Sequence, residues 1–548
     1  MKRRSLSCVL CALMLVFQAC KKNEEPGAKP ENASAQNPVT DINKSSGLKV
    51  DITPGAYGTY QLINSENNKT GQIAGLSVTN YGTGDIADYK GNAHQKWRIT
   101  YKGGAYFTFM NLGSGKMLES FNYNGKQELV QNNVSGNDSQ LWRIIQISDK
   151  KYSITNKASN LTITGNPAGR ILLTAYAAKP AQLWGLNVLT TAAYRDDIVN
   201  NFFRRRLPSQ GSVAFDQGSS TPLSWGANNG KVLWVTQDAY DGSMLKSSTN
   251  ANLKCGFFQY NNSMMIQPSI SDWNPDNTPN ITIPNSAQRR PRQVVDNQPG
   301  ADWSWPGVCV EIGNKVYVHN GEGKGLGMLN QSLFELTQAA GTEWTTKRLT
   351  PAGMSGQTET NFSIGFVKPG DGFVYSFGTK GAGFNGSDLY VARFPVTDPL
   401  SWTYWNGTAW TTTRSVATAA KIGHGQQNLT VGYLNGKYIL MQLDLGFFCD
   451  PGKHNIYLAT STSPTGPFTA FKEVFTIEDR YRGHLNRYYT PMIHPESVNG
   501  KNELLLTYSL NFGSGCAGVG DDNCVNNEQP STNYQVKGVR VPYSLIGL

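Results

Sequence analysis

The tripeptides Gln95-Lys96-Trp97, Gln140-Leu141-Trp142 and Gln182-Leu183-Trp184 share the pattern Gln-x-Trp and decide the fold of the first folded part of this sequence. They recur roughly every 40 to 45 residues, a period typical of repeat architectures. Short alternating runs such as 106–110 and 152–154 lie between them and indicate β-strands. The pattern therefore predicts three similar β units between about residues 53 and 190.

These three units resemble the ricin-type β-trefoil lectins. The resemblance implies that the tryptophans are core residues and that the glutamines help to fix the sugar-binding loops. In the middle unit it places an acidic sugar-binding residue at Glu119, in the run Ser114 to Glu119, with Tyr123 stacking on a sugar and Asn132 completing the polar set. The alternative is a trefoil that has lost sugar binding and serves as a spacer.

A second pattern begins near residue 194, where five pairs of apolar strands alternate with turns rich in Asn, Gly and Asp. Five such meanders favour a five-bladed β-propeller over a two-sheet sandwich. The predicted fold class is therefore all-β, with a β-trefoil at 53–190 followed by a propeller at 194–548. The expected first and second strands of the five blades are 212–215 and 232–235, 307–310 and 315–318, 362–366 and 373–376, 429–433 and 438–441, and 490–493 and 503–508.

Two aspartates follow strands of the first predicted blade. Asp216 follows the strand at 212–215, and Asp238 comes shortly after the strand at 232–235, in the run Thr236-Gln237-Asp238. The segment 215–240, with 260–263 and the last-blade segments 489–495 and 506–511, resembles five-bladed propellers related to the endo-D-arabinanases, although Gln237 replaces their usual Gly or Ser. The resemblance implies that Asp216 and Asp238 are catalytic carboxylates.

Elementary chemistry gives the same prediction, since cleavage of a glycosidic bond commonly needs a protonated acid and a second carboxylate. Glu359, before the first strand of blade three, is a third catalytic candidate, and Glu322 in blade two is a candidate for substrate binding. The simpler interpretation of each of these carboxylates is a loop residue that caps a turn or faces solvent.

Further polar and aromatic residues are expected at the channel. His319, His424 and His494 fall at strand ends of three blades, where they could bind substrate hydroxyls. They lack a metal-ligand spacing such as His-x-x-x-His, so we predict no metal. Trp305 and Tyr489 are candidates for stacking on sugar rings, with core packing as the alternative for each.

The N-terminal segment predicts export. Lys2-Arg3-Arg4 precede the apolar run 7–17, which is too short to span a bilayer comfortably and fits a signal peptide. Phe17-Gln18-Ala19-Cys20 resembles a bacterial lipobox, which implies a signal at 1–19 and a lipid on Cys20. Residues 20–52 then form a flexible linker, poor in large apolar side chains. The alternative is an ordinary cleaved signal and secretion.

Composition supports an exported, turn-rich β protein. Of 548 residues, 11% are aromatic, 16% are charged and 57 are Gly, a profile typical of turn-rich β proteins. The net charge is +10, or 10 − 3 = +7 without the three basic residues of the signal. Export argues against nucleic acid as the partner. Among the eight cysteines, Cys516 and Cys524 bracket a short loop and are the best disulfide pair.

We therefore expect a monomeric glycoside hydrolase on the bacterial outer membrane or cell surface, acting without a cofactor on a polysaccharide or glycan. One alternative is a metal-dependent glycan deacetylase that uses the channel histidines. Another is a surface glycan-binding lipoprotein without activity.

Replacing Cys20 tests the anchor. The wild-type protein should partition with membranes, and Cys20→Ser should release it, because two acyl chains are needed for stable membrane attachment and the serine variant carries none. Fractionation followed by mass spectrometry of the N-terminal peptide measures this. Recovery of the wild-type chain as free, unlipidated protein would contradict the prediction.

Overall fold

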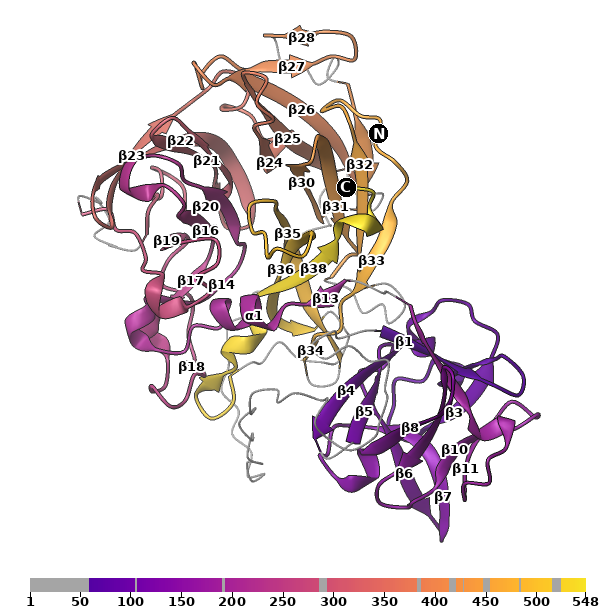
Figure 1. Ribbon diagram of the computed structural model, residues 1–548. Helices are drawn as coiled ribbons and strands as arrows, with labels where there is room; N and C mark the ends of the chain where they lie inside the picture. The colour runs from indigo at the N-terminus through magenta and orange to yellow at the C-terminus, as the bar shows by residue number, and fades with distance from the viewer. Residues whose placement is uncertain are drawn as a thin grey trace, which may run out of the picture.

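The computed structural model describes residues 59–103, 106–189, 193–284, 293–381, 386–412, 420–426, 428–446, 454–481, 484–514 and 524–548. The predicted signal at 1–19, Cys20 and the linker at 20–52 lie outside these ranges. The described chain is nearly all β and forms two bodies, a trefoil and a ring of sheets (Figure 1). The predicted fold class is confirmed. Within the described ranges, no helix has the length and the apolar run needed to cross a membrane.

The trefoil is built from twelve strands that pair in one continuous network. The strands are β1 (Thr59–Asn64), β2 (Thr70–Ile73), β3 (Gly82–Ala87), β4 (Trp97–Gly103), β5 (Tyr106–Asn111), β6 (Met117–Tyr123), β7 (Lys126–Asn132), β8 (Trp142–Ser148), β9 (Lys151–Asn156), β10 (Thr162–Gly165), β11 (Ile171–Thr174) and β12 (Trp184–Val188).

The three Gln-x-Trp motifs form the same hydrogen bonds in each unit. Trp97, Trp142 and Trp184 are buried in one core and donate their indole N–H groups to backbone oxygens of other strands, at 2.8 to 3.0 Å. Each glutamine accepts a backbone N–H five residues upstream and donates to a backbone oxygen seven residues upstream. The accepted N–H groups belong to Lys90, Ser135 and Ala177. The motif therefore satisfies buried polar groups at three equivalent loops.

The ring has five blades. Blade one contains β15 (Ser219–Pro222), β16 (Val232–Thr236) and β19 (Ser263–Gln267). Blade two contains β20 (Trp303–Ile312), β21 (Lys315–Lys324), β22 (Gly327–Ala340) and β23 (Glu343–Leu349). Blade three contains β24 (Asn361–Val367), β25 (Phe373–Gly381), β26 (Ser387–Pro395), β27 (Thr403–Trp405), β28 (Trp410–Thr411) and β29 (Gly423–Gly425).

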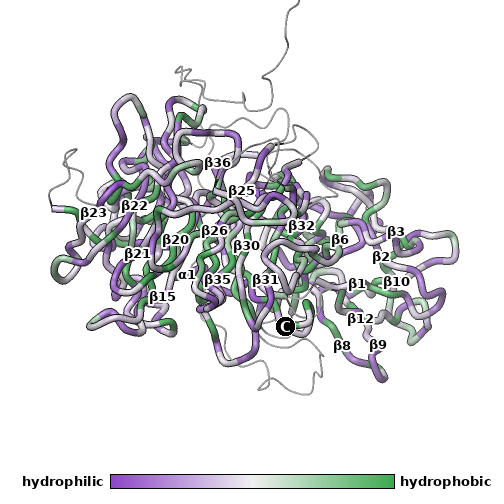
Figure 2. Tube along the Cα trace, turned by 90° about the horizontal axis from the view of Figure 1, so that it is seen from above, coloured by the Kyte–Doolittle hydropathy of each residue, from purple (hydrophilic) through white to green (hydrophobic). Residues whose placement is uncertain are grey.

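Blade four contains β30 (Asn428–Leu434), β31 (Lys437–Leu443), β32 (Asn455–Ser461) and β33 (Lys472–Thr476). Blade five contains β34 (Arg480–Tyr481), β35 (His484–His494), β36 (Glu503–Ser514), β38 (Val536–Pro542) and β13 (Tyr194–Arg195). The inner strands β15, β20, β24, β30 and β35 contact one another in that order, and β35 returns to β15. The ring is thus closed, with apolar segments along strands such as β20 and β30 (Figure 2).

Closure joins the beginning of the propeller to its end. Tyr194 and Arg195 of β13 pair with Arg540 and Val539 of β38, so the first strand completes the last blade. The helix α1 (Asp197–Phe203) follows directly and packs against β38. This pairing removes a free sheet edge from blade five.

Blade one differs from the prediction. The segment 212–215 forms β14 (Ser212–Phe215), which pairs with β17 (Ala239–Asp241) outside the blade, while β15 is the inner strand. β15 reads Ser-Ser-Thr-Pro and has no apolar alternation, so the period-2 signal of a strand is missing there.

The predicted disulfide between Cys516 and Cys524 is wrong. Cys524 is bonded to Cys255, which is 269 residues away. The pairing of β18 (Leu253–Lys254) with β37 (Glu528–Gln529) brings the two cysteines together, and no sequence spacing reveals it. Cys449 and Cys516 lie outside the described residues, while Cys309 is buried and free.

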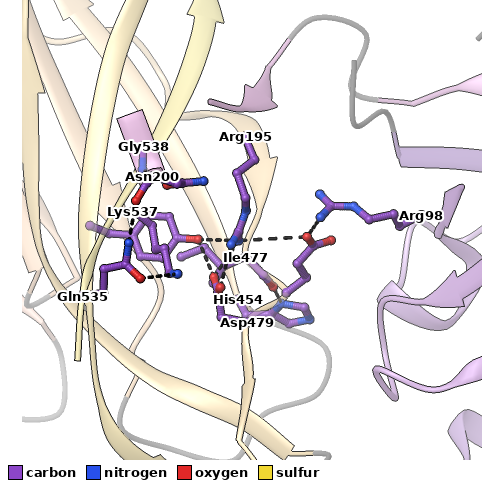
Figure 3. A network of polar contacts seen from close by, with 11 residues as sticks. Arg98, Arg195, Asn200, His454, Ile477, Asp479, Gln535, Lys537 and Gly538 are labelled. Carbon is purple, nitrogen blue, oxygen red and sulfur yellow. Dashed lines mark hydrogen bonds and ion pairs between the residues drawn. The ribbon is translucent and has the colours of Figure 1, made fainter. Parts of the chain in front are cut away.

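Charged groups attach the trefoil to the propeller. Arg98 of β4 forms a buried ion pair with Glu478, and Lys96 lies 3.0 Å from Glu473. Beside this contact, Arg195 holds Asp479 through two bonds of 2.6 Å (Figure 3). The surface around the first Gln-x-Trp motif is therefore occupied by the propeller.

Glycine allows the inner strands to approach closely. A Cβ atom at Gly307 would lie 2.7 Å from Ser363 of the next blade, and one at Gly432 would lie 2.7 Å from Ile493. At Gly365 of β24, a Cβ would lie 2.6 Å from the backbone oxygen of Val431. These distances are too short for any side chain, so the narrow ring needs glycine at these positions.

Gly365→Ala should therefore destabilise the propeller by about 1–3 kcal/mol, because the new methyl group meets backbone that cannot move aside. Gly381→Ala is the matched control, since a Cβ there meets nothing within 4 Å. Urea unfolding of both variants measures the difference. Equal stability of the two variants would show that the ring relaxes around the methyl group.

Candidate active site

Asp216 and Asp238 lie side by side in the structure. The Asp216 N–H donates to the Asp238 backbone oxygen at 3.3 Å, and the Gln237 N–H donates to the Asp216 backbone oxygen at 3.0 Å. The two aspartates are only 4% and 6% exposed. The backbone thus holds the two buried aspartates next to each other. Their catalytic role stays a prediction.

The carboxyl group of Asp216 is held from one side by tyrosines. Tyr489 of β35 donates its hydroxyl hydrogen to Oδ2, and Tyr534 also forms a hydrogen bond with this carboxyl group. Oδ1 is buried and has no hydrogen-bond partner in the described part of the chain. One oxygen is therefore positioned by the protein while the other stays available.

Asp238 is held by different groups. Trp305 of β20 donates its indole N–H to Oδ1 at 2.9 Å, and Asn261 donates an amide N–H to the same oxygen at 3.3 Å. The Trp305 ring stacks on Trp303 with centroids 3.8 Å apart. Trp305 therefore orients the carboxyl group of Asp238. Its ring stacks on Trp303, whereas the sequence predicted that it stacks on a sugar.

Burial changes the acidity of both groups. Loss of hydration raises the pKa of Asp216 to about 6, although the hydrogen bonds from Tyr489 and Tyr534 oppose the change. The pKa of Asp238 is raised well above its ordinary value, first by burial and then by the negative charge of Asp216. Two adjacent carboxyl groups with raised pKa values can share a proton near neutral pH.

The backbone beside both partners is strained. Gln217, directly after Asp216, and Thr490, directly after Tyr489, each have φ +46°, which is unfavourable for residues other than glycine. Gln217 is held by bonds from its N–H to Ser509 and from its amide to the oxygen of Pro306. A register shift in β35 follows Tyr489. Such strain is typical of functional sites, where surrounding contacts enforce one geometry.

The site is assembled where blades one, two and five meet. Asp216 and Asp238 come from blade one, Trp305 from blade two and Tyr489 from blade five. Partly exposed polar and aromatic residues surround the two carboxyl groups; they are Gln237, Asn261, Trp305, Tyr489 and Asn511. This arrangement places partly exposed groups that can hydrogen-bond or stack next to a buried carboxyl pair, a combination that suits hydroxylated ligands.

Glu322 and Glu359 come from other blades than the two aspartates. Glu322 accepts two bonds from Arg348, at 2.7 and 2.8 Å, within blade two. Burial would raise its pKa, but Arg348 and Ser332 keep the pKa below the ordinary value. Glu359 is exposed before β24. An ion pair explains Glu322 more simply than substrate binding does.

The three histidines occupy separate positions. His319 is buried in blade two and bonds to Gln331 at 3.0 Å, while His424 lies on the surface, 2.8 Å from Asp388. His494 is buried between blades one and five, where its two ring nitrogens contact Ser220 and Thr507. Among the described residues, no group of three or more His, Cys, Asp and Glu side chains is arranged to hold a metal ion.

In the trefoil, Glu119 accepts a bond from Gln140 at 2.7 Å and one from Ser139 at 3.3 Å. Tyr123 is 60% exposed on the same face of β6. Asn132 is buried, and its side-chain oxygen accepts the Tyr81 N–H at 3.1 Å. Asn132 thus holds a loop of the first unit, a role that the predicted sugar contact did not include.

Tyr534 and Asn261 were not predicted as site residues, although Asn261 lies in the segment 260–263 that carries part of the resemblance. Tyr489 was predicted to stack on a sugar, and the structure instead shows it bonded to Asp216, which is 273 residues away. A hydrogen bond across the ring leaves no local pattern in the sequence, so no signal could have identified Tyr534.

Comparison with known proteins identifies the family of the second part. A family model described as a domain of unknown function, DUF5005, matches residues 196–541. The chain belongs to this family. A model of the ricin-type β-trefoil lectin domain-like family matches residues 93–170, as the Gln-x-Trp motifs predicted. No curated protein matches the chain.

Solved structures resemble each part of this DUF5005 protein. ThreeFoil, a designed 3-fold symmetric protein, is 24% identical over 24% of this chain and 99% of its own, with a TM-score of 0.23. A "putative hydrolase" from Bacteroides ovatus is 19% identical over 64% of this chain and 90% of its own, with a TM-score of 0.47.

An exo-beta-1,3-galactanase from Clostridium thermocellum is 24% identical over 24% of this chain and 30% of its own, with a TM-score of 0.23. None of these likenesses bears on activity. The relation to endo-D-arabinanases stays a prediction.

The raised pKa of Asp216 predicts a stability effect. Between about pH 4 and pH 6, Asp216 holds a proton in the folded protein but has lost it in the unfolded chain. The contribution of Asp216 to the free energy of unfolding therefore falls as pH rises. Asp216→Asn should therefore raise stability at pH 7 by on the order of 2 kcal/mol, and the gain should vanish near pH 4.

Thermal unfolding from pH 4 to pH 8 measures this effect. Asp398→Asn is the control, because Asp398 is fully exposed and its pKa is lowered, by the hydrogen bond from Ser401. An Asp216→Asn variant that is destabilised equally at every pH would contradict the assignment of a buried, strained carboxyl group.

Proposed function

We propose that this DUF5005 protein is a glycoside hydrolase that cleaves a polysaccharide or complex glycan at the Asp216–Asp238 pair. The observation that carries the proposal is the pairing of two buried carboxyl groups with raised pKa values at the junction of three blades. Hydrolysis of a glycosidic bond needs this combination of a proton donor and a carboxylate.

The contacts favour a division of roles. Asp238 has the pKa raised by both burial and a neighbouring charge, so it is the group that stays protonated and donates to the leaving oxygen. Among the residues that the structure describes, none bonds to Oδ1 of Asp216, while Tyr489 holds Oδ2. Asp216 therefore acts as the carboxylate, either on water or on the anomeric carbon. Tyr489 and Trp305 act as positioning residues for these groups.

The trefoil supports action on a glycan, because a lectin-like domain binds carbohydrate. Its buried ion pair with the propeller, Arg98–Glu478, keeps the two parts in contact. In this proposal the trefoil holds a polymer near the carboxyl pair, which raises the local concentration of substrate. A lipid on Cys20 would place both parts at the outer membrane or the cell surface.

Incubation with a polysaccharide panel tests the proposal. Wild-type protein should produce new reducing ends from at least one substrate, and Asp216→Asn and Asp238→Asn should each lower the rate by about 10²–10⁴-fold while the fold is retained. Glu359→Gln is the control for a carboxylate outside the pair. Near-normal rates in both aspartate variants would overturn this site.

The other candidate functions give different outcomes in the same experiment. Release of acetate that a chelator stops, and that changing His319 or His494 abolishes, would replace the hydrolase by a deacetylase. Polysaccharide binding without any product would leave a binding protein.

A further inference from the structure

The outward face of β6 carries an acidic residue and two aromatic residues in a row. Glu119, Phe121 and Tyr123 alternate with the buried Leu118 and Ser120, so the three share one partly or fully exposed face. Successive residues on one face of a strand are roughly 7 Å apart. The row thus combines hydrogen-bond acceptors with apolar rings over the length of a short sugar chain.

Only the middle unit has a carboxylate at this position. The buried tryptophans donate to the backbone oxygens of Gly71, Leu118 and Ile163, which marks equivalent places in the three units. The residues that follow are Gln72, Glu119 and Thr164. The Glu119 carboxylate can accept hydrogen bonds from two sugar hydroxyls. The Gln72 amide and the Thr164 hydroxyl are neutral and are weaker acceptors.

A fourth residue joins the row from the first unit. The Tyr81 ring lies 4.8 Å from the Phe121 ring, centroid to centroid, and Tyr81 is 57% exposed. Tyr81 has φ +65°, a costly conformation for an aromatic residue. The positive φ thus displays the Tyr81 ring on the surface beside Phe121.

Several bonds impose this conformation. The Tyr81 N–H donates to the Gln131 backbone oxygen at 2.8 Å and to the Asn132 side chain at 3.1 Å. The buried Gln131 amide donates to the oxygens of Ser77 and Thr79, at 2.8 and 2.9 Å. The loop before β3 is therefore fastened onto the hairpin of β6 and β7, and Tyr81 is held in place before any ligand arrives.

We infer that Tyr81, supported by Phe121, is the aromatic platform of a glycan site whose polar acceptor is Glu119. The occupant is a chain of at least two sugar residues: one ring stacks on Tyr81, its hydroxyls donate to Glu119, and the chain continues toward Tyr123. This inference rests on the trefoil binding glycan, and it moves the main stacking contact from Tyr123 to Tyr81.

Affinity electrophoresis in gels containing arabinan, arabinogalactan, galactan or xylan tests the site. The assay uses the chain with Asp216→Asn, so that binding is measured without turnover. At least one polymer should retard this protein. Adding Tyr81→Asn should weaken that binding about tenfold, since asparagine accepts the positive φ but lacks the ring. Tyr81→Phe keeps the ring and should bind normally.

Tyr176→Ala is the matched control, because Tyr176 is 43% exposed in the third unit of the trefoil. It should leave binding unchanged, and Glu119→Gln should weaken it. Equal retardation of the Tyr81→Asn variant and its parent overturns the inference, as does the absence of retardation by every polymer. The Tyr81→Asn variant with Asp216 intact is also assayed for hydrolysis. If this variant still cleaves substrate, a loss of binding concerns the Tyr81 platform and not the catalytic site.

Discussion

Closure of the ring at Arg195 and Asp196 is the constraint on which the rest of this structure depends. The backbone of Arg195 pairs with Val539, and its guanidinium group holds Asp479 and the hydroxyl of Tyr508. Asp196 caps α1 and accepts a bond of 2.8 Å from Arg540. Two consecutive residues thus fasten the first strand of the propeller to its last blade, with charge-assisted hydrogen bonds that are protected from solvent.

The same residues connect the propeller to the trefoil. Asp479 is adjacent to Glu478, the partner of Arg98 across the contact. Burial alone would raise the pKa of Asp479, but the charge of Arg195 keeps it far below its ordinary value. Removing either member of such a buried pair leaves an uncompensated charge, which is strongly destabilising. Arg195 also lies 4.0 Å from Glu478, so ring closure and trefoil docking share one charged group.

The candidate active site lies along the seam that this closure creates. Asp216 belongs to the first blade, while Tyr489 and Ser509, which hold Asp216 and Gln217, belong to the last. Two buried carboxyl groups oppose folding at neutral pH, and closure supplies the contacts that keep them in place. This is the usual balance between stability and function: strain is tolerated where surrounding interactions over-determine the geometry.

The trefoil shows how three similar units take different roles. The surface around Trp97 docks onto the propeller through Lys96 and Arg98, whereas the middle unit carries Glu119 and receives Tyr81 from its neighbour. The repeated core residues give the three units the same fold, while their surface residues differ and make different contacts.

The sequence by itself determined the trefoil and the five blades, because these depend on local periodicity and on repeated motifs. It also singled out Asp216 and Asp238 through a resemblance, and their catalytic role stays a prediction. It predicted the wrong inner strand in blade one, since Ser219–Pro222 lacks apolar alternation, and the wrong partner for Cys524. Tertiary structure alone decided that Tyr489 and Tyr534 hold Asp216, that Glu322 is neutralised by Arg348, and that Tyr81 lies beside Phe121. Each of these contacts joins segments that only strand pairing or ring closure brings together, and side-chain periodicity carries no information about which distant strand ends will meet.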